Sequence, residues 1–142
     1  MVSALILRCD FGGSHEQLLG FLSTCRRSFH KLAQVQELCV HLACQAAAKI
    51  LARSCGGDPR RHTAATLDAA RACVAFCHVT LPSLQQAQPK LNLMLQAASV
   101  ALMNGLVSQS ESLVRGAVAL AREEAEGAER DGFLRQCASL CL

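Results

Sequence analysis

The chain has 142 residues, of which 51% are apolar and 18% are charged, and its formal net charge is +3. This composition excludes a disordered chain and gives room for one domain rather than two. The basic residues are scattered and tryptophan and tyrosine are absent, so the composition also argues against a nucleic-acid-binding surface.

Alanine and leucine dominate the apolar residues and there are only three prolines. These residues favour helices over strands, so we predict an all-α fold. Nine cysteines form an odd set without a disulfide-framework pattern. We find no signal peptide and no apolar run of the roughly 18 residues that span a membrane. We therefore expect a cytosolic protein with reduced thiols.

The first helix is expected after residues 1–13, which we predict to be irregular. Gly12 and Gly13 break the chain, and Ser14 can cap a helix that runs from His15 to Lys31. A second helix is predicted over Ala33–Ser54. Its apolar stripe is Val35, Leu38, Leu42 and Ala46, and its polar strip is Glu37, His41, Gln45, Lys49 and Arg53.

A third helix is predicted from Pro59, capped by Asp58, to Leu81. Its buried face is expected to hold Leu67, Ala70, Cys73, Val74, Phe76, Cys77 and Leu81. A narrow polar ridge remains, made of Asp68, Arg71 and His78. This pattern indicates a helix that is covered by neighbours on two sides.

The fourth helix follows Pro82 and Ser83, with Pro89 expected to kink it or to delay its start. Its expected stripe is Leu84, Leu91, Leu95, Ala98 and Leu102. A fifth helix is predicted over Leu106–Glu124, with Leu113, Ala117 and Leu120 inward and an ion pair between Glu111 and Arg115. Residues 126–132 read as a polar loop. Residues 133–142 begin an apolar helix that ends without a cap, which suggests a truncated chain.

About five helices and a truncated sixth, joined by short glycine-marked turns, indicate antiparallel hairpins stacked as an α-solenoid (HEAT-like) fragment over residues 1–142. We find no strict internal period. Because a solenoid needs polar capping repeats, we expect the isolated chain to aggregate.

The cysteines were weighed as metal ligands, as a redox pair and as core residues. On a helix Cys73 and Cys77 lie about 40° apart and share a face, whereas His78 points about 100° away from Cys77. Cys137 and Cys141 repeat the same spacing, so a four-cysteine zinc site is conceivable. Because each pair lies on an apolar stripe, we favour the interpretation that these cysteines pack in the core.

No catalytic, cofactor-binding or metal-binding residues are assigned. His30, His41 and His62 are expected on polar faces or turns, away from a nucleophile. Gly12 and Gly13 before a helix could bind an anion, but no lysine follows them as in a phosphate-binding loop. The chemistry therefore favours a non-enzymatic binding scaffold, with partner-contacting residues unknown. An unrelated helical-repeat adaptor and a cysteine-based metal-binding domain remain alternatives.

Three stretches carry a resemblance to a known family. They are "CRRSFHKL" (25–32), "RACVAFCHVTLPSL" (71–84) and "LNLMLQAASVALMNGLVSQSESLVRGAVAL" (91–120). Together they resemble the vacuolar protein sorting-associated protein 35-like family, in an internal part of its C-terminal half. That family provides the large α-solenoid subunit of the retriever complex.

The resemblance implies a role in returning membrane cargo from endosomes to the plasma membrane. It implies binding to a metallophosphatase-fold subunit and membership of a commander-type assembly with coiled-coil subunits. An arrestin-like subunit would bind parts of the family's chain that are absent here. The protein would be cytoplasmic and peripherally associated with endosomes through its partners, without a cofactor.

Overall fold

The computed structural model describes residues 1–125 and 128–141, and these residues form an all-α fold. The α-helices are α1 (Val2–Arg8), α2 (His15–Ser28), α3 (Ala33–Ser54), α4 (Ala64–Thr80), α5 (Ala87–Met103), α6 (Val107–Glu123) and α7 (Ala128–Cys141). Two short 3-10 turns, η1 (Pro59–Arg61) and η2 (Leu81–Ser83), flank α4. The predicted fold class is confirmed.

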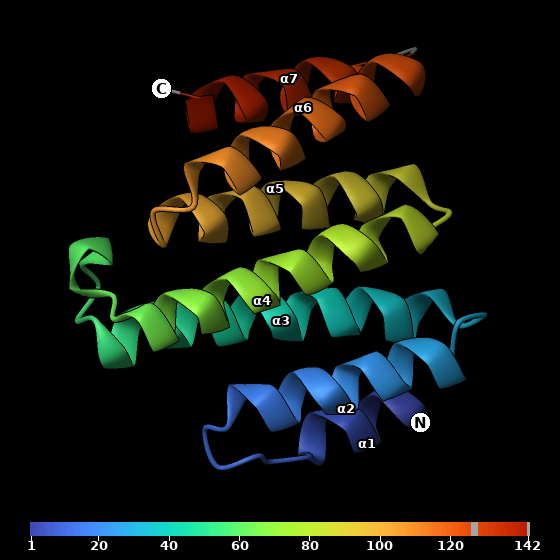
Figure 1. Cartoon of the computed structure of the whole chain (residues 1–142). Helices are drawn as coiled ribbons and strands as arrows, with labels where there is room; N and C mark the ends of the chain where they lie inside the picture. The colour runs from blue at the N-terminus through green and yellow to red at the C-terminus, as the bar shows by residue number, and fades with distance from the viewer. Residues whose placement is uncertain (126–127, 142) are drawn as a thin grey trace.

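Successive helices lie side by side in chain order, each running against its predecessor, from α2 at one end of the stack to α7 at the other (Figure 1). The short α1 packs beside α2 and α3 at the N-terminal end. From α2 onward, consecutive helices contact each other, and α3 and α2 also contact the helix two positions further along, α5 and α4 respectively. Hairpins stacked in this way are typical of an α-solenoid fragment.

Helix starts follow the hydrogen-bonding residues in the sequence. Ser14 Oγ accepts from the Gln17 N–H at 3.4 Å, so the predicted cap of α2 is confirmed. Asp58 and Pro59 start only η1, and the prediction that α4 begins there was wrong. Thr63 begins α4 instead, because its hydroxyl and that of Thr66 satisfy each other's backbone N–H groups in a capping box.

Both ends of the chain are more helical than expected. Residues 1–13 were predicted to be irregular, but Val2–Arg8 forms α1, which buries Ile6 against the stack. The loop predicted over residues 126–132 is also too long, because α7 begins at Ala128. Residues 126, 127 and 142 lie outside the described residues, and so does the end of the predicted last helix.

The core runs continuously along the stack and is built from small and medium side chains. On α3 the buried face is shifted from the predicted stripe: Leu38 and Leu42 are half-buried, while Cys39 and Cys44 are fully buried. The reason is that α3 contacts α4 and α5 as well as α1 and α2, so its buried arc is wide. On α5, Leu102 was predicted inside but is exposed, and Ala101 is buried instead.

The delayed start predicted for α5 is confirmed, since the helix begins at Ala87 and Pro89 falls in its first turn, where no intrahelical N–H bond is lost. The predicted pair between Glu111 and Arg115 is present on α6.

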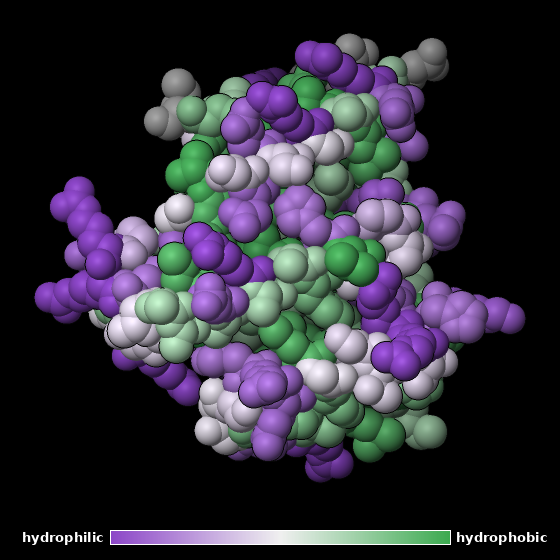
Figure 2. Space-filling model, in the orientation of Figure 1, coloured by the Kyte–Doolittle hydropathy of each residue, from purple (hydrophilic) through white to green (hydrophobic). Residues whose placement is uncertain are grey.

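Polar side chains extend from the two edges of the stack, where the helices are joined. Apolar areas lie between these two edges (Figure 2). One segment, Ala64–Ser83, is long and apolar enough in composition to cross a membrane, with a mean hydropathy of 1.2. Ala70, Cys73 and Cys77 in this segment are buried in the stack. Its apolar character therefore fits a core helix.

Candidate functional site

Cys73 and Cys77 lie in the core between α3 and α4, as the sequence predicted. Both are at most 1% exposed. The Sγ atoms of Cys77 and Cys44 are 3.7 Å apart, and Cys77 also donates to the Val40 carbonyl oxygen at 3.8 Å. The sulfur separation is far beyond the roughly 2 Å of a disulfide, so these are free thiols.

The surroundings of these thiols keep them protonated. Burial raises the pKa of Cys39 to about 11 and that of Cys73 to about 12, with neighbouring thiols adding to the effect. The hydrogen bond with Cys44 and burial raise the pKa of Cys77 further. Because thiolates are the nucleophiles and the metal ligands, thiols held in this state serve as small apolar packing groups.

The second cysteine pair is split between two environments. Cys137 is buried on α7, whereas Cys141 is exposed. Among the described side chains, those of residues 1–125 and 132–141, no three Cys, His, Asp or Glu groups converge in a way that could hold a metal ion. The four-cysteine arrangement considered from the sequence is therefore not assembled in the structure.

The structure does bring together a thiol, an imidazole and an amide that the sequence analysis had not connected. Cys55 Sγ lies 3.3 Å from Nδ1 of His62, and Nε2 of His62 lies 2.9 Å from Oδ1 of Asn104. Thr66 Oγ1 is also 3.1 Å from Nδ1. The cluster joins the turn after α3 to the C-terminal end of α5, which places it between elements 42 residues apart in the chain.

Hydrogen bonds around Asn104 fix the orientation of the cluster. Its Nδ2 donates to the carbonyl oxygens of Val100 at 2.9 Å and Ala47 at 3.3 Å, so its Oδ1 is the free acceptor. Nε2 of His62 therefore donates to Oδ1 of Asn104, and Nδ1 lies within hydrogen-bonding distance of Cys55 and Thr66.

A thiol, imidazole and amide in this order resemble a cysteine-hydrolase triad, but the setting differs. Cys55 is only 1% exposed at the C-terminal end of α3, so its Sγ is not accessible to a substrate. Asn104 is also buried. The cluster therefore acts as a polar tie between the α3–α4 turn and α5.

The other predicted histidine positions are partly confirmed. His30 is exposed. His41 is half-buried, with its Nδ1 within 3.2 Å of the Gln96 amide on α5 and its Nε2 2.9 Å from Nε2 of Gln45. His62 lies on a turn, as expected, at the end of η1, but it is half-buried in the cluster described above.

The buried amide of Gln36 was also missed, because the sequence places it beside the apolar stripe of α3. Its Nε2 donates to the carbonyl oxygens of Arg26 and Phe29, each at 3.1 Å. These two bonds satisfy the C-terminal end of α2 and fix it against α3. Buried polar groups in this protein thus hold helix ends together.

Comparison with known proteins identifies a family that matches this chain. The family model of the VPS35L C-terminal domain matches residues 1–140, well beyond the stretches that carry the resemblance in the sequence. A VPS35 endosomal protein sorting factor-like protein of Dictyostelium discoideum is 35% identical over 126 residues, which is 86% of this chain and 12% of that protein.

Vertebrate relatives match at the same level. The Homo sapiens VPS35 endosomal protein-sorting factor-like protein is 32% identical over all 142 residues, which is 14% of its length. The Rattus norvegicus protein is 33% identical over 95% of this chain and 14% of that protein. This chain therefore spans about one seventh of its curated relatives, and it belongs to the VPS35L family through that family's C-terminal domain.

Proposed function

We propose that this chain is a non-enzymatic scaffold segment of an endosomal cargo-recycling complex of the retriever type. Its family membership carries the proposal, because the relatives are named as endosomal protein sorting factors. The helix stack supports it, since an array of antiparallel helices presents a long surface that suits the binding of other proteins.

The chemistry of the described side chains supports a scaffold rather than an enzyme. The thiols between α3 and α4 are protonated and buried, and the cluster of Cys55, His62 and Asn104 ties helices together. The remaining polar contacts, such as that of Ser110 Oγ with the Ala98 carbonyl oxygen at 2.9 Å, also join neighbouring helices.

The proposed partners follow from the family. The metallophosphatase-fold subunit is the direct partner of this segment. The arrestin-like subunit would bind elsewhere on a full-length chain, and coiled-coil commander subunits would join the larger assembly. In this proposal the protein is cytoplasmic and reaches endosomes through its partners.

A chimera tests this proposal without relying on the stability of the short chain. The human relative matches all 142 residues, so its corresponding segment can be replaced by this chain. We expect the chimera to co-precipitate the human metallophosphatase-fold subunit as the unmodified protein does, and a deletion of the segment to lose it.

The arrestin-like subunit is the internal control, because it should co-precipitate with all three proteins. A chimera that retains the arrestin-like subunit but loses the metallophosphatase-fold subunit would contradict the proposal. It would favour a helical adaptor with a different partner.

A further inference from the structure

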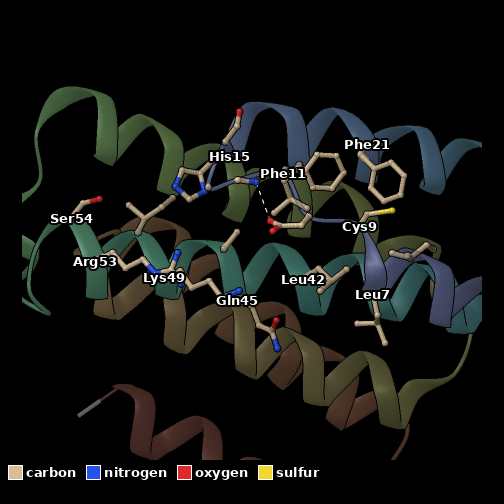
Figure 3. A pocket seen from close by; sticks show the side chains of 18 residues that line it. Leu7, Cys9, Phe11, His15, Phe21, Leu42, Gln45, Lys49, Arg53 and Ser54 are labelled. Atoms are coloured by element: carbon tan, nitrogen blue, oxygen red, sulfur yellow. Dashed lines mark hydrogen bonds between the residues drawn. The ribbon is translucent and has the colours of Figure 1, made fainter.

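A groove of about 620 Å³ lies at the N-terminal end of the stack, between the α1–α2 loop and one face of α3 (Figure 3). We call it the N-terminal groove. The rings of Phe11 and Phe21, 5.1 Å apart, lie in its wall, and Gly12 and Gly13 form part of the loop above it. Its volume falls in the range of ligand-binding clefts.

The groove has an apolar lining and a basic rim. Leu7, Leu18 and Leu42, which are exposed or half-buried, contribute apolar surface from three helices. Lys49 and Arg53 lie one turn apart on α3, and His15 faces them from the first position of α2 (Figure 3). The combination is amphipathic, so it suits a ligand with both an apolar part and negative charge.

The positive charge in the groove is largely uncompensated. No ion pair among the side chains that the structure describes, 1–125 and 132–141, involves Lys49 or Arg53. Asp10 is the one carboxylate among the lining residues, and its Oδ1 accepts from the Gly12 N–H at 3.0 Å. No lysine follows Gly12 and Gly13 directly, but in the folded chain α3 places Lys49, 36 positions after Gly13, in the same groove.

We propose that the N-terminal groove binds a short acidic segment of a partner protein. A bulky aliphatic side chain of that segment enters the apolar lining, and its carboxylates pair with Lys49 and Arg53. Charge complementarity selects an acidic ligand, and the apolar lining selects against a bare anion, which would leave that surface wet. The concave shape favours an inserted side chain over a flat membrane surface.

This proposal goes beyond the scaffold function and does not depend on it. An acidic segment could come from any protein that the scaffold carries, and the metallophosphatase-fold subunit could bind elsewhere on the stack. The two proposals therefore stand or fall in separate experiments.

Fluorescence anisotropy with a labelled peptide of sequence Glu-Asp-Ile-Ile-Asp-Glu tests the charge half of the proposal. We expect saturable binding to the human chimera that carries this chain in place of its own segment, and this binding should weaken with added salt. The double variant Lys49→Gln/Arg53→Gln should weaken binding about tenfold, since it removes two ion pairs at a partly exposed rim. The matched variant Arg27→Gln/Arg60→Gln, which changes two exposed arginines outside the groove, should bind within about twofold of the parent.

Variants of two leucines in α1 test whether the apolar lining contributes to peptide binding. Leu7 lines the groove and is 61% exposed, whereas Leu5 is 58% exposed and is not among the lining residues. Leu7→Ser should weaken peptide binding several-fold and Leu5→Ser should not. Since both side chains are exposed, circular dichroism should show that both variants keep the helical content of the parent.

Three results would overturn the proposal. The first is equal binding of a Lys-Arg-Ile-Ile-Arg-Lys peptide. The second is full competition by millimolar inorganic phosphate, which would indicate a site for a bare anion. The third is capture of the chain by vesicles of phosphatidylcholine and phosphatidylserine, dependent on Lys49 and Arg53, without binding of the acidic peptide.

Discussion

The helix pair α3 and α4 (the α3–α4 layer) and the helix pair α5 and α6 (the α5–α6 layer) are both closely packed, but with different side chains. In both, alanines allow close approach, such as Ala43, Ala47 and Ala70 in the first layer and Ala98 and Ala117 in the second. The first layer adds four thiols, namely Cys39, Cys44, Cys73 and Cys77, to aliphatic side chains such as Val40 and Val74. The second uses larger aliphatic side chains, including Leu95, Leu113 and Val114.

This difference shows what the thiols contribute. A cysteine matches the small volume that close helices leave, and it adds weak hydrogen bonds such as the one from Cys39 Sγ to the Leu22 carbonyl oxygen at 3.9 Å. It also places an ionisable group in the core. The stability of the two layers should therefore respond differently to truncation of a buried side chain, to a charge introduced into the core and to a rise in pH.

The largest effect is expected from a charge placed in the α5 core. Leu91 is 3% exposed, and Leu91→Asp would bury a carboxylate without a partner. We expect a loss of more than about 4 kcal/mol and a chain that no longer unfolds cooperatively. Chemical denaturation followed by circular dichroism measures this. Asn92→Asp, at the exposed neighbouring position, is the control and should change stability by less than about 0.5 kcal/mol.

Alkaline pH should destabilise the α3–α4 layer in particular. The folded state raises the pKa of Cys73 to about 12 and raises that of Cys77 as well. Because the unfolded chain releases these protons near pH 9 while the folded chain keeps them, stability is full below pH 9 and falls as the pH rises. Each thiol contributes up to about 1.4 kcal/mol per pH unit, so the two together lower stability by up to about 3 kcal/mol at pH 10.

Urea denaturation between pH 7 and pH 10.5, with reductant present, measures this loss. Cys73→Ala should reduce the slope of stability against pH above 9, whereas Cys9→Ala, at an exposed cysteine, should leave it unchanged. The chain has no tyrosine to titrate in this range. Equal slopes in the two variants would contradict the assignment of the slope to the buried thiols.

A smaller effect is expected where the two layers are tied together. Asn104→Ala removes the donor to the Ala47 and Val100 carbonyl oxygens and leaves Nε2 of His62 without its acceptor. Leaving buried polar groups unpaired costs about 1–3 kcal/mol. A thermal unfolding scan measures the change, and Asn92→Ala on the exposed face of α5 should show almost none. An Asn104→Ala chain as stable as the parent would contradict the role of the cluster as a tie.

The sequence predicted the local features of this fold well. The bounds of α3 and the cap of α2 follow from residues close together in the chain, as does the late start of α5, which places Pro89 in the first turn. The short α1 was missed because seven residues give too little periodicity, and its stability comes from packing Ile6 on the stack.

Contacts between residues far apart in the chain could not be predicted from the sequence. His62 and Asn104 are separated by 42 positions, and no local pattern predicts that one accepts from the other. The N-terminal groove combines Gly12 with Lys49 in the same manner. Cys73, Cys77 and Cys137 were assigned to the core correctly because each lies on an apolar stripe, which is a local signal. The same signal was wrong for Cys141, which is exposed.

The smallest effect is expected from truncating a thiol, which separates the packing interpretation from the metal interpretation directly. Cys73 is fully buried, and Cys73→Ala removes only the sulfur while keeping a good helix former. We expect a loss of about 1 kcal/mol with the helical content unchanged, less than the 2–5 kcal/mol typical of leucine truncation in the α5–α6 layer, for example in Leu113→Ala. Metal analysis of parent and variant purified under reducing conditions should show no difference. Loss of a stoichiometric metal ion in the variant would show that Cys73 is a ligand, and the packing account of the α3–α4 layer would then be wrong.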